Sequence, residues 1–170
     1  MRRTPERRAS PPQIDIQTQS PLWKAQPLAE QTVRDAVAAA ASALSTADSE
    51  VSIVLTDDSA MAVLNRDWRG IDKPTNVLSF PASGHKASET PRFLGDIVIA
   101  YETLVRECDD EDRKFLHHLA HLAVHGFLHL VGYDHETDAQ AEKMEGLESK
   151  IMTRMNMPDP YIIPRDLGDA

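Results

Sequence analysis

The chain has 170 residues, of which 41% are hydrophobic and 26% charged, and this size suits one domain of ordinary globular composition. Its single cysteine, Cys108, excludes an internal disulfide and suits a reducing compartment. No apolar run approaches the roughly 18 residues of a membrane span, and no apolar stretch follows the basic N-terminus as in a secretory signal. We therefore expect a cytoplasmic protein without a membrane partner.

The formal net charge of −9 argues mildly against non-specific binding to duplex DNA, since proteins that bind in this way are normally basic. The first ten residues contain four arginines and one glutamate, so the remainder of the chain is more acidic than the whole. Any nucleic-acid role must therefore depend on a local patch, on this basic arm, or on a partner that supplies the docking.

The first half of the chain predicts two strands and two helices. Apolar and polar residues alternate over residues 13–17, as in a short strand, and an apolar helical pattern covers 28–44. A strand over 51–55 is followed by residues that favour a helix start at 56–58. This second helix should run through Trp68, because Gly70 then interrupts the pattern.

The second half predicts two strands separated by a polar loop, and then three helices: strands 76–80 and 93–100, loop 82–92, and helices 101–106, 111–131 and 138–155. Thr137 or Asp138 can cap the last helix, and Gly132 stands where the preceding one should stop. The order of elements predicts a three-layer α/β (or α+β) domain, in which a small mixed sheet of about four strands packs with several helices. We expect one domain over 13–157, between a disordered basic tail (1–12) and a C-terminal tail (158–170).

Six of the seven histidines lie between positions 117 and 135. Three of them, His125, His129 and His135, form the pattern H-x3-H-x5-H. A pair of histidines at i and i+4 places two imidazoles on one helix face, and Gly132 allows the chain to reverse and bring His135 to the same point. Three nitrogen ligands with an open fourth position are typical of a catalytic zinc, so we predict one Zn²⁺ per chain. A closed structural site would need a fourth ligand, and Cys108 is far away in sequence.

The neighbouring residues limit the chemistry. His118 and His121, like His117, are best interpreted as hydrogen-bonding residues of an amphipathic helix, although His118 could lie above the site and His121 beside it. Gly126 stands where zinc endopeptidases with the same histidine spacing carry their glutamate base, which argues against peptide hydrolysis by that mechanism. A substrate with its own nucleophile or base, such as an RNA 2′-hydroxyl or phosphate, would need the glutamate less.

Three blocks of sequence, taken together, carry a resemblance. They are N-R-D-W-R followed by K-P-T-N-V-L-S-F-P (65–69 and 73–81), L-G-D-I-V-I (94–99) and H-G-F-L-H-L-V-G-Y-D-H (125–135). These blocks resemble the YbeY family of bacterial endoribonucleases, which are rRNA maturation factors. Met144, Glu145 and Glu148 fit that family's last helix, and the resemblance covers roughly residues 51–157.

The resemblance implies a single α/β metallohydrolase-like domain that holds zinc through His125, His129 and His135. It implies single-strand-specific RNA cleavage, 16S rRNA 3′-end maturation and ribosome quality control. The implied partners are single-stranded rRNA and the ribosome or small ribosomal subunit with its assembly factors. It also implicates Arg69 in catalysis, and a guanidinium does present a planar fork of donors to phosphate. Without the resemblance, Arg69 would be interpreted as a solvated residue at a helix end.

Weaker candidates for substrate contacts surround these positions: Lys73, Thr75, Asn76, Ser79, Asp96, Tyr133, Asp134 and Glu136. Two other functions stay open: a non-catalytic ribosome assembly factor with a structural metal, and a metallopeptidase-like zinc hydrolase without the glutamate base. The sequence also leaves open the metal in the cell, the nucleophile, the general base, the oligomeric state and the role of the N-terminal arginines.

Overall fold

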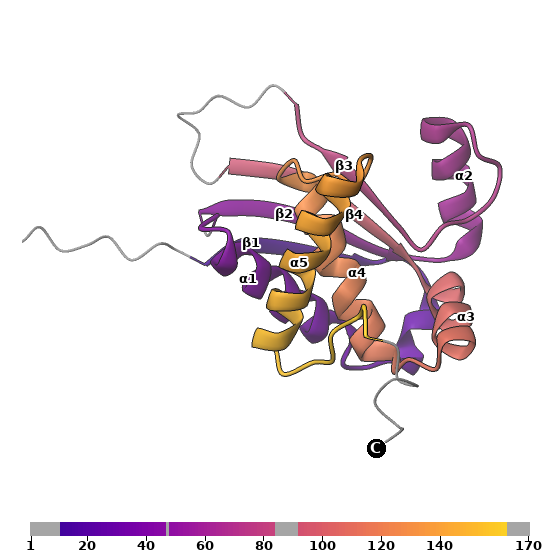
Figure 1. Cartoon of the computed structure of the whole chain (residues 1–170). Coiled ribbons are helices and arrows are strands. Elements are labelled where there is room, and N and C mark those ends of the chain that lie inside the picture. Colours follow the sequence, from indigo (N-terminus) through magenta and orange to yellow (C-terminus); the bar gives the residue numbers. More distant parts are fainter. Residues whose placement is uncertain (1–10, 47, 84–91, 163–170) are drawn as a thin grey trace, which may run out of the picture.

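The structure is a computed structural model, and it describes residues 11–46, 48–83 and 92–162 (Figure 1). Most of the predicted N-terminal tail, the central part of the predicted polar loop and the last eight residues, 163–170, lie outside the described residues.

The strands form one mixed sheet in the order β1-β2-β4-β3. Their bounds are β1 (Gln13–Thr18), β2 (Ser49–Thr56), β3 (Val77–Pro81) and β4 (Arg92–Ala100). β2 pairs in parallel with both β1 and β4, whereas β3 runs antiparallel to β4 at the edge. All four predicted strands are present, and the prediction of a small mixed sheet is confirmed.

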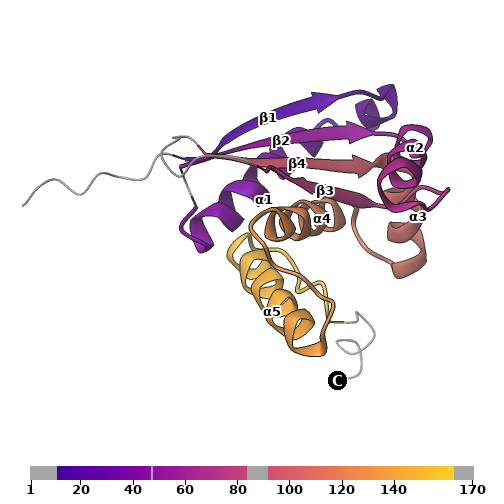
Figure 2. The ribbon, with the colours of Figure 1, turned by 90° about the horizontal axis from the view of Figure 1, so that it is seen from above.

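The described residues also form five α-helices and one short 3-10 helix. Their bounds are η1 (Pro21–Ala25), α1 (Ala29–Ala43), α2 (Asp58–Arg69), α3 (Tyr101–Glu111), α4 (Phe115–Leu130) and α5 (Asp138–Arg154). Figure 2 shows α1 and α4 lying along one face of the sheet with α5 outside α4, while α2 and α3 stand near the ends of the parallel strands. Among these helices, none has the length and apolar character to cross a bilayer.

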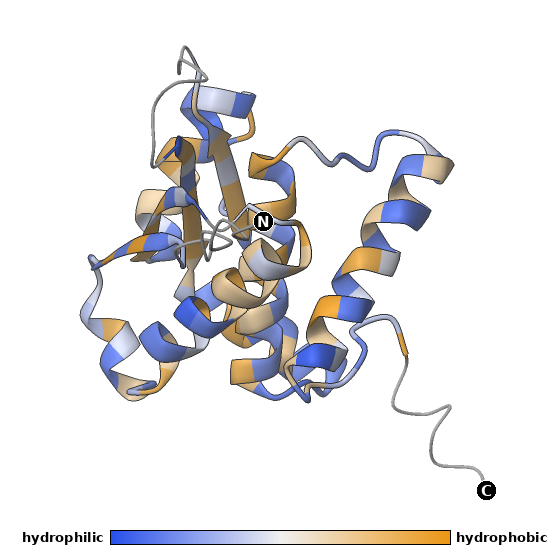
Figure 3. Cartoon of the chain, turned by 90° about the vertical axis from the view of Figure 1, so that its left-hand side faces the viewer, coloured by the Kyte–Doolittle hydropathy of each residue, from blue (hydrophilic) through white to orange (hydrophobic). Residues whose placement is uncertain are grey.

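The side chains of β4 divide the core between the two faces of the sheet. Ile97 and Ile99 belong to the large cluster formed with α1, α4 and α5, whereas Val98 and Ala100 belong to a smaller cluster that contains Met61 of α2. Figure 3 shows that hydrophobic residues gather where the strands meet the helices and that hydrophilic residues dominate the outer surfaces. The molecule therefore has helices on both faces of its sheet, with the thicker side formed by α1, α4 and α5.

Two predicted helix bounds are wrong at the junction of α3 and α4. The helix expected over 101–106 continues to Glu111, and the helix expected from residue 111 begins only at Phe115. Asp112 separates them because its backbone is left-handed, with a φ of 52°, and Arg113 N bonds back to Cys108 O over 3.0 Å. Aspartate adopts this conformation more readily than most residues, but neither glycine nor proline marks the break.

The 3-10 helix η1 was not predicted from the sequence. Ser20 caps it, since its hydroxyl accepts a hydrogen bond from Leu22 N over 3.3 Å. The buried indole of Trp23 then donates to Thr56 O at the end of β2, over 2.9 Å. This long-range contact anchors the turn between β1 and α1, and no local sequence pattern indicates it.

Candidate metal centre

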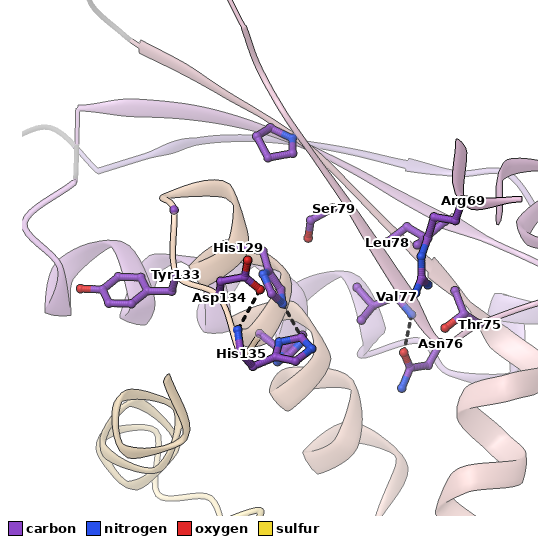
Figure 4. A pocket seen from close by; sticks show the side chains of 13 residues that line it. Arg69, Thr75, Asn76, Val77, Leu78, Ser79, His129, Tyr133, Asp134 and His135 are labelled. Atoms are coloured by element: carbon purple, nitrogen blue, oxygen red, sulfur yellow. Dashed lines mark hydrogen bonds between the residues drawn. The ribbon is translucent and has the colours of Figure 1, made fainter. Parts of the chain in front are cut away.

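The last two turns of α4 carry the first two predicted metal ligands. His125 and His129 lie one turn apart on the same helix, as their spacing predicts. Gly132 adopts a φ of 101° directly after the helix, so the chain reverses and returns His135 toward the other two rings. Figure 4 shows the His129 and His135 rings side by side at the wall of a pocket.

The three imidazoles converge on one point. One ring nitrogen of each of His125, His129 and His135 lies within 4.8 Å of the others. The Nε2 atoms of His125 and His129 are 3.1 Å apart. Two nitrogen ligands bound tetrahedrally to one zinc ion, each about 2.05 Å from it, would be about 3.3 Å apart. The donor set and its spacing therefore fit a single divalent ion with an open coordination position.

A buried carboxylate orients the His125 ring. Glu148 of α5 is 0% exposed, and its Oε1 accepts from His125 Nδ1 over 2.6 Å while its Oε2 accepts from His121 Nε2 over 2.8 Å. Burial alone would raise the pKa of Glu148, but the hydrogen bonds from His121, His125 and Tyr161 outweigh it and lower this pKa to about 2. An ionised carboxylate only accepts hydrogen bonds, so the His125 proton lies on Nδ1 and Nε2 presents a lone pair.

The environment of His129 favours the neutral imidazole. Burial lowers the pKa of His129, and electrostatic interaction with the neighbouring His125 and His135 rings lowers it further. A hydrogen bond to the backbone of Tyr133 and the nearby carboxylate of Asp134 act in the opposite direction without reversing the shift. Neutral imidazole is the form that binds a metal.

The imidazoles line a cavity of about 550 Å³ that also receives Arg69 from the end of α2. Arg69 Nη1 donates to Asn65 Oδ1 over a long 3.4 Å. Within the described residues, this leaves most of the five guanidinium N–H groups of Arg69 available to a ligand. Figure 4 shows Arg69 across the pocket from the imidazoles. Five weaker candidates line the same cavity, namely Thr75, Asn76, Ser79, Tyr133 and Asp134, whereas Lys73, Asp96 and Glu136 do not.

A second carboxylate network fixes the wall formed by β3. Asn76 Nδ2 donates to both oxygens of Glu107 over 3.0 and 3.2 Å, and its Oδ1 accepts from Val77 N over 2.7 Å. His118 Nε2 lies 3.1 Å from Glu107 Oε1, behind this pair. Burial raises the pKa of Glu107, but the hydrogen bonds from His118 and Asn76 outweigh it, so the pKa is lowered. The amide of Asn76 is thereby held in one orientation at the pocket edge.

Glutamine in place of Glu107 should make the free energy of unfolding less dependent on pH in the acid range. Because folding lowers the pKa of Glu107 below its ordinary value of 4.5, its contribution is fully present above that pH and lost as the pH falls through the folded value. We expect Glu107→Gln to reduce the free energy of unfolding by about 1 kcal/mol near neutral pH and by much less at an acid pH below the folded-state pKa of Glu107, measured by urea unfolding. Glu142→Gln, which removes an exposed carboxylate of α5, is the control. An equal loss at both pH values would contradict the prediction.

Several residues of the site were not identified from their own sequence pattern. No local pattern indicates Glu107 or Tyr161, and only the family resemblance indicates Glu148. The structure pairs His118 with Glu107 and His121 with Glu148, so neither lines the pocket with His125. For His121, the available sequence signal is its place four residues before a proposed ligand, together with the acidic residues of the last predicted helix.

The family model described as "Endoribonuclease YbeY" matches residues 13–156. Proteins of that name are 54% identical over 156 residues in Rhodopseudomonas palustris strain BisB18, covering 89% of this chain and 93% of that protein. The protein of that name from Bradyrhizobium diazoefficiens is 52% identical over 156 residues, which cover 88% of this chain and 85% of that protein. In Nitrobacter winogradskyi the identity is 52% over 163 residues, covering 92% and 86%.

Among solved structures, the solution structure of TM1509 from Thermotoga maritima is similar, with a TM-score of 0.50 and 25% sequence identity. The alignment covers 92% of this chain and 99% of that one. The sequence blocks, the match to the family model over most of the chain and relatives above 50% identity agree, and the chain belongs to the Endoribonuclease YbeY family.

Proposed function

We propose that this chain is a zinc-dependent endoribonuclease that cuts single-stranded RNA. Its proposed role is in 16S rRNA 3′-end maturation and ribosome quality control in the cytoplasm, with the ribosome or its small subunit and assembly factors as partners. One observation carries the proposal: three convergent imidazoles and an arginine line the same pocket in a member of an endoribonuclease family. The acidic net charge is compatible with RNA binding that is local or assisted by the ribosome.

In this proposal His125, His129 and His135 hold the ion. All three donors are imidazole nitrogens, a set that suits zinc better than magnesium or calcium, which prefer oxygen ligands. A divalent ion held there supplies Lewis acidity toward a phosphodiester. Glu148 keeps the Nδ1 proton of His125 in place.

Arg69 is proposed to bind the scissile phosphate. Its guanidinium can donate two parallel hydrogen bonds to phosphate oxygens and stabilise the extra negative charge of a pentavalent phosphorus. It enters the pocket from α2, whereas the histidines come from α4 and the segment after it, so a phosphate between them would be contacted from two sides. Asn76, whose side-chain amide donates to Glu107, lines the same pocket.

We expect Arg69→Gln to cleave single-stranded rRNA fragments about 100-fold more slowly than the wild type, the usual effect of removing one charge-stabilising donor. Its zinc content should be unchanged, because Arg69 is not in the histidine cluster. His129→Ala should lose both zinc and cleavage. Metal analysis and gel-resolved cleavage, before and after chelation and zinc return, measure these effects.

Arg66→Gln is the matched control, because Arg66 lies on the same helix in an exposed ion pair with Asp67. It should cleave at the wild-type rate. Equal cleavage by the wild type, Arg69→Gln and His129→Ala would identify the activity as a contaminant and refute the proposed catalysis. Rescue of an rRNA-processing defect by zinc-free His129→Ala would instead favour a non-catalytic assembly factor.

A further inference from the structure

The five residues that follow the turn after α5, residues 158–162, form a segment that we call the C-terminal strap. Arg113 Nη2 donates to Pro160 O over 2.6 Å, which fastens the strap to the junction of α3 and α4. On the other side, Ser149 of α5 donates to Asp159 Oδ1 over 2.9 Å, and Tyr161 N donates to the same oxygen over 3.0 Å. These bonds fix the two residues before Tyr161 and the backbone N–H of Tyr161 itself.

The fixed strap directs the Tyr161 side chain toward Glu148 and His121, which lie next to the candidate metal centre. The Tyr161 hydroxyl donates to Glu148 Oε2 and lies 3.4 Å from His121 Nε2. The phenol ring also meets the His121 ring edge-on, with centroids 5.6 Å apart and an interplanar angle of 83°. Tyr161 and His121 therefore share one carboxylate oxygen, while His125 Nδ1 occupies the other over 2.6 Å.

A carboxylate sealed from water needs protein donors for its lone pairs. Glu148 is 0% exposed, so the hydrogen bonds of Tyr161, His121 and His125 replace hydration and limit rotation of the carboxylate. Rotation of that group would displace the acceptor of the His125 Nδ1 proton. Groups that orient a ligating histidine influence metal affinity without touching the ion.

We propose that Tyr161 is a positioning residue of the metal centre: from the C-terminal strap, its hydroxyl fixes Glu148, and Glu148 fixes the His125 ring with Nε2 toward the ion. The inference rests on the histidine site of the proposed function, but it does not depend on RNA cleavage. The alternative is that Tyr161 only packs the strap against α5.

Zinc affinity distinguishes these two roles. The full-length protein, stripped of metal, is titrated with Zn²⁺ in competition with a chromogenic chelator. We expect Tyr161→Phe, which keeps the ring and removes the hydroxyl, to raise the Kd for Zn²⁺ about tenfold, the lower end of the usual effect of a group that supports a ligand. Ile162→Ala is the matched control, because it shortens an exposed neighbour on the same strap, and it should bind Zn²⁺ like the wild type.

A double-mutant cycle tests whether Tyr161 acts through Glu148. In a Glu148→Gln background, Tyr161→Phe should change the Kd by less than about twofold, because the two residues form one chain of contacts. Urea unfolding of each metal-free variant checks that the fold is retained. An unchanged Kd for Tyr161→Phe, an additive effect in the cycle, or an equal loss in Ile162→Ala would overturn the inference.

The outcome separates this inference from the proposed function. A wild type that binds Zn²⁺ but does not cleave RNA would refute the nuclease proposal and leave the role of Tyr161 intact. A wild type that cleaves RNA and shares its zinc Kd with Tyr161→Phe would refute only the role of Tyr161. A wild type without zinc affinity would refute both.

Discussion

Replacing Glu148 with glutamine is expected to weaken Zn²⁺ binding by about 10- to 100-fold, because it disturbs the group that sets the tautomer of His125, a proposed zinc ligand. The carboxylate accepts from His125 on one oxygen and from His121 on the other. A glutamine has a donor where one of these acceptors was. If the NH₂ group of this glutamine faces His125, the ring must accept at Nδ1 and carry its proton on Nε2. That proton occupies the lone pair with which Nε2 would bind the ion.

Chelator competition measures this change, and a neighbouring glutamate provides the control. Glu145 lies on the same helix as Glu148 but is exposed, so Glu145→Gln removes the same charge without touching the imidazoles. It should bind Zn²⁺ as the wild type does. A Glu148→Gln protein that remains folded in urea titrations and keeps wild-type zinc affinity would show that Glu148 does not orient His125.

The parts of the site that were predictable from sequence depend on local geometry. The i, i+4 spacing of His125 and His129 fixes their common face as soon as α4 forms. Gly132 indicates the chain reversal, because a φ of 101° is strained for other residues. The start of α5 is equally local, since Thr137 and Gln140 form a capping box.

The supporting residues could not be predicted in this way, because their positions depend on how helices pack. Glu148 lies 23 positions after His125 and reaches it only because α5 docks against α4. Glu107 contacts Asn76, which is 31 positions away in sequence, and Tyr161 contacts His121, which is 40 positions away. No spacing rule connects such residues, whereas a buried acidic residue within a helix suggests only that a partner exists.

The structure also gives a physical reason for the glycine that separates this chain from zinc endopeptidases. A Cβ atom added at Gly126 would lie 2.9 Å from Ile97 Cγ2, 3.1 Å from Ser79 Oγ and 3.4 Å from Val77 Cγ2. The Ser79 hydroxyl also donates to Gly126 O over 2.9 Å, so α4 is bonded directly to β3 at this point. Gly126 therefore allows the helix to lie close to the sheet, and a glutamate there would point into β3 and β4.

Two glycine-to-alanine changes should shift stability in opposite directions. Gly126→Ala is expected to lower the free energy of unfolding by about 1–2 kcal/mol, because overpacking exceeds the gain in helix propensity. Ile97 is fully buried and stiff at its branched carbon, and Ser79 is held by its hydrogen bond, so neither can yield easily. Gly146→Ala is the control, because nothing lies within 4 Å of its added Cβ in α5, and it should raise stability by about 0.5–1 kcal/mol.

The larger change, Gly126→Glu, should disrupt the packing of α4 on the sheet and not create a peptidase. Its side chain would place a carboxylate among Ile97, Val77 and Ser79, which costs more than a methyl group because the charge would have no partner there. We expect urea unfolding to show a loss of more than about 3 kcal/mol, or a chain that does not fold, without turnover of casein. A stable Gly126→Glu protein that binds zinc and cleaves casein would show that this position faces the ion, and the packing explanation for Gly126 would then be wrong.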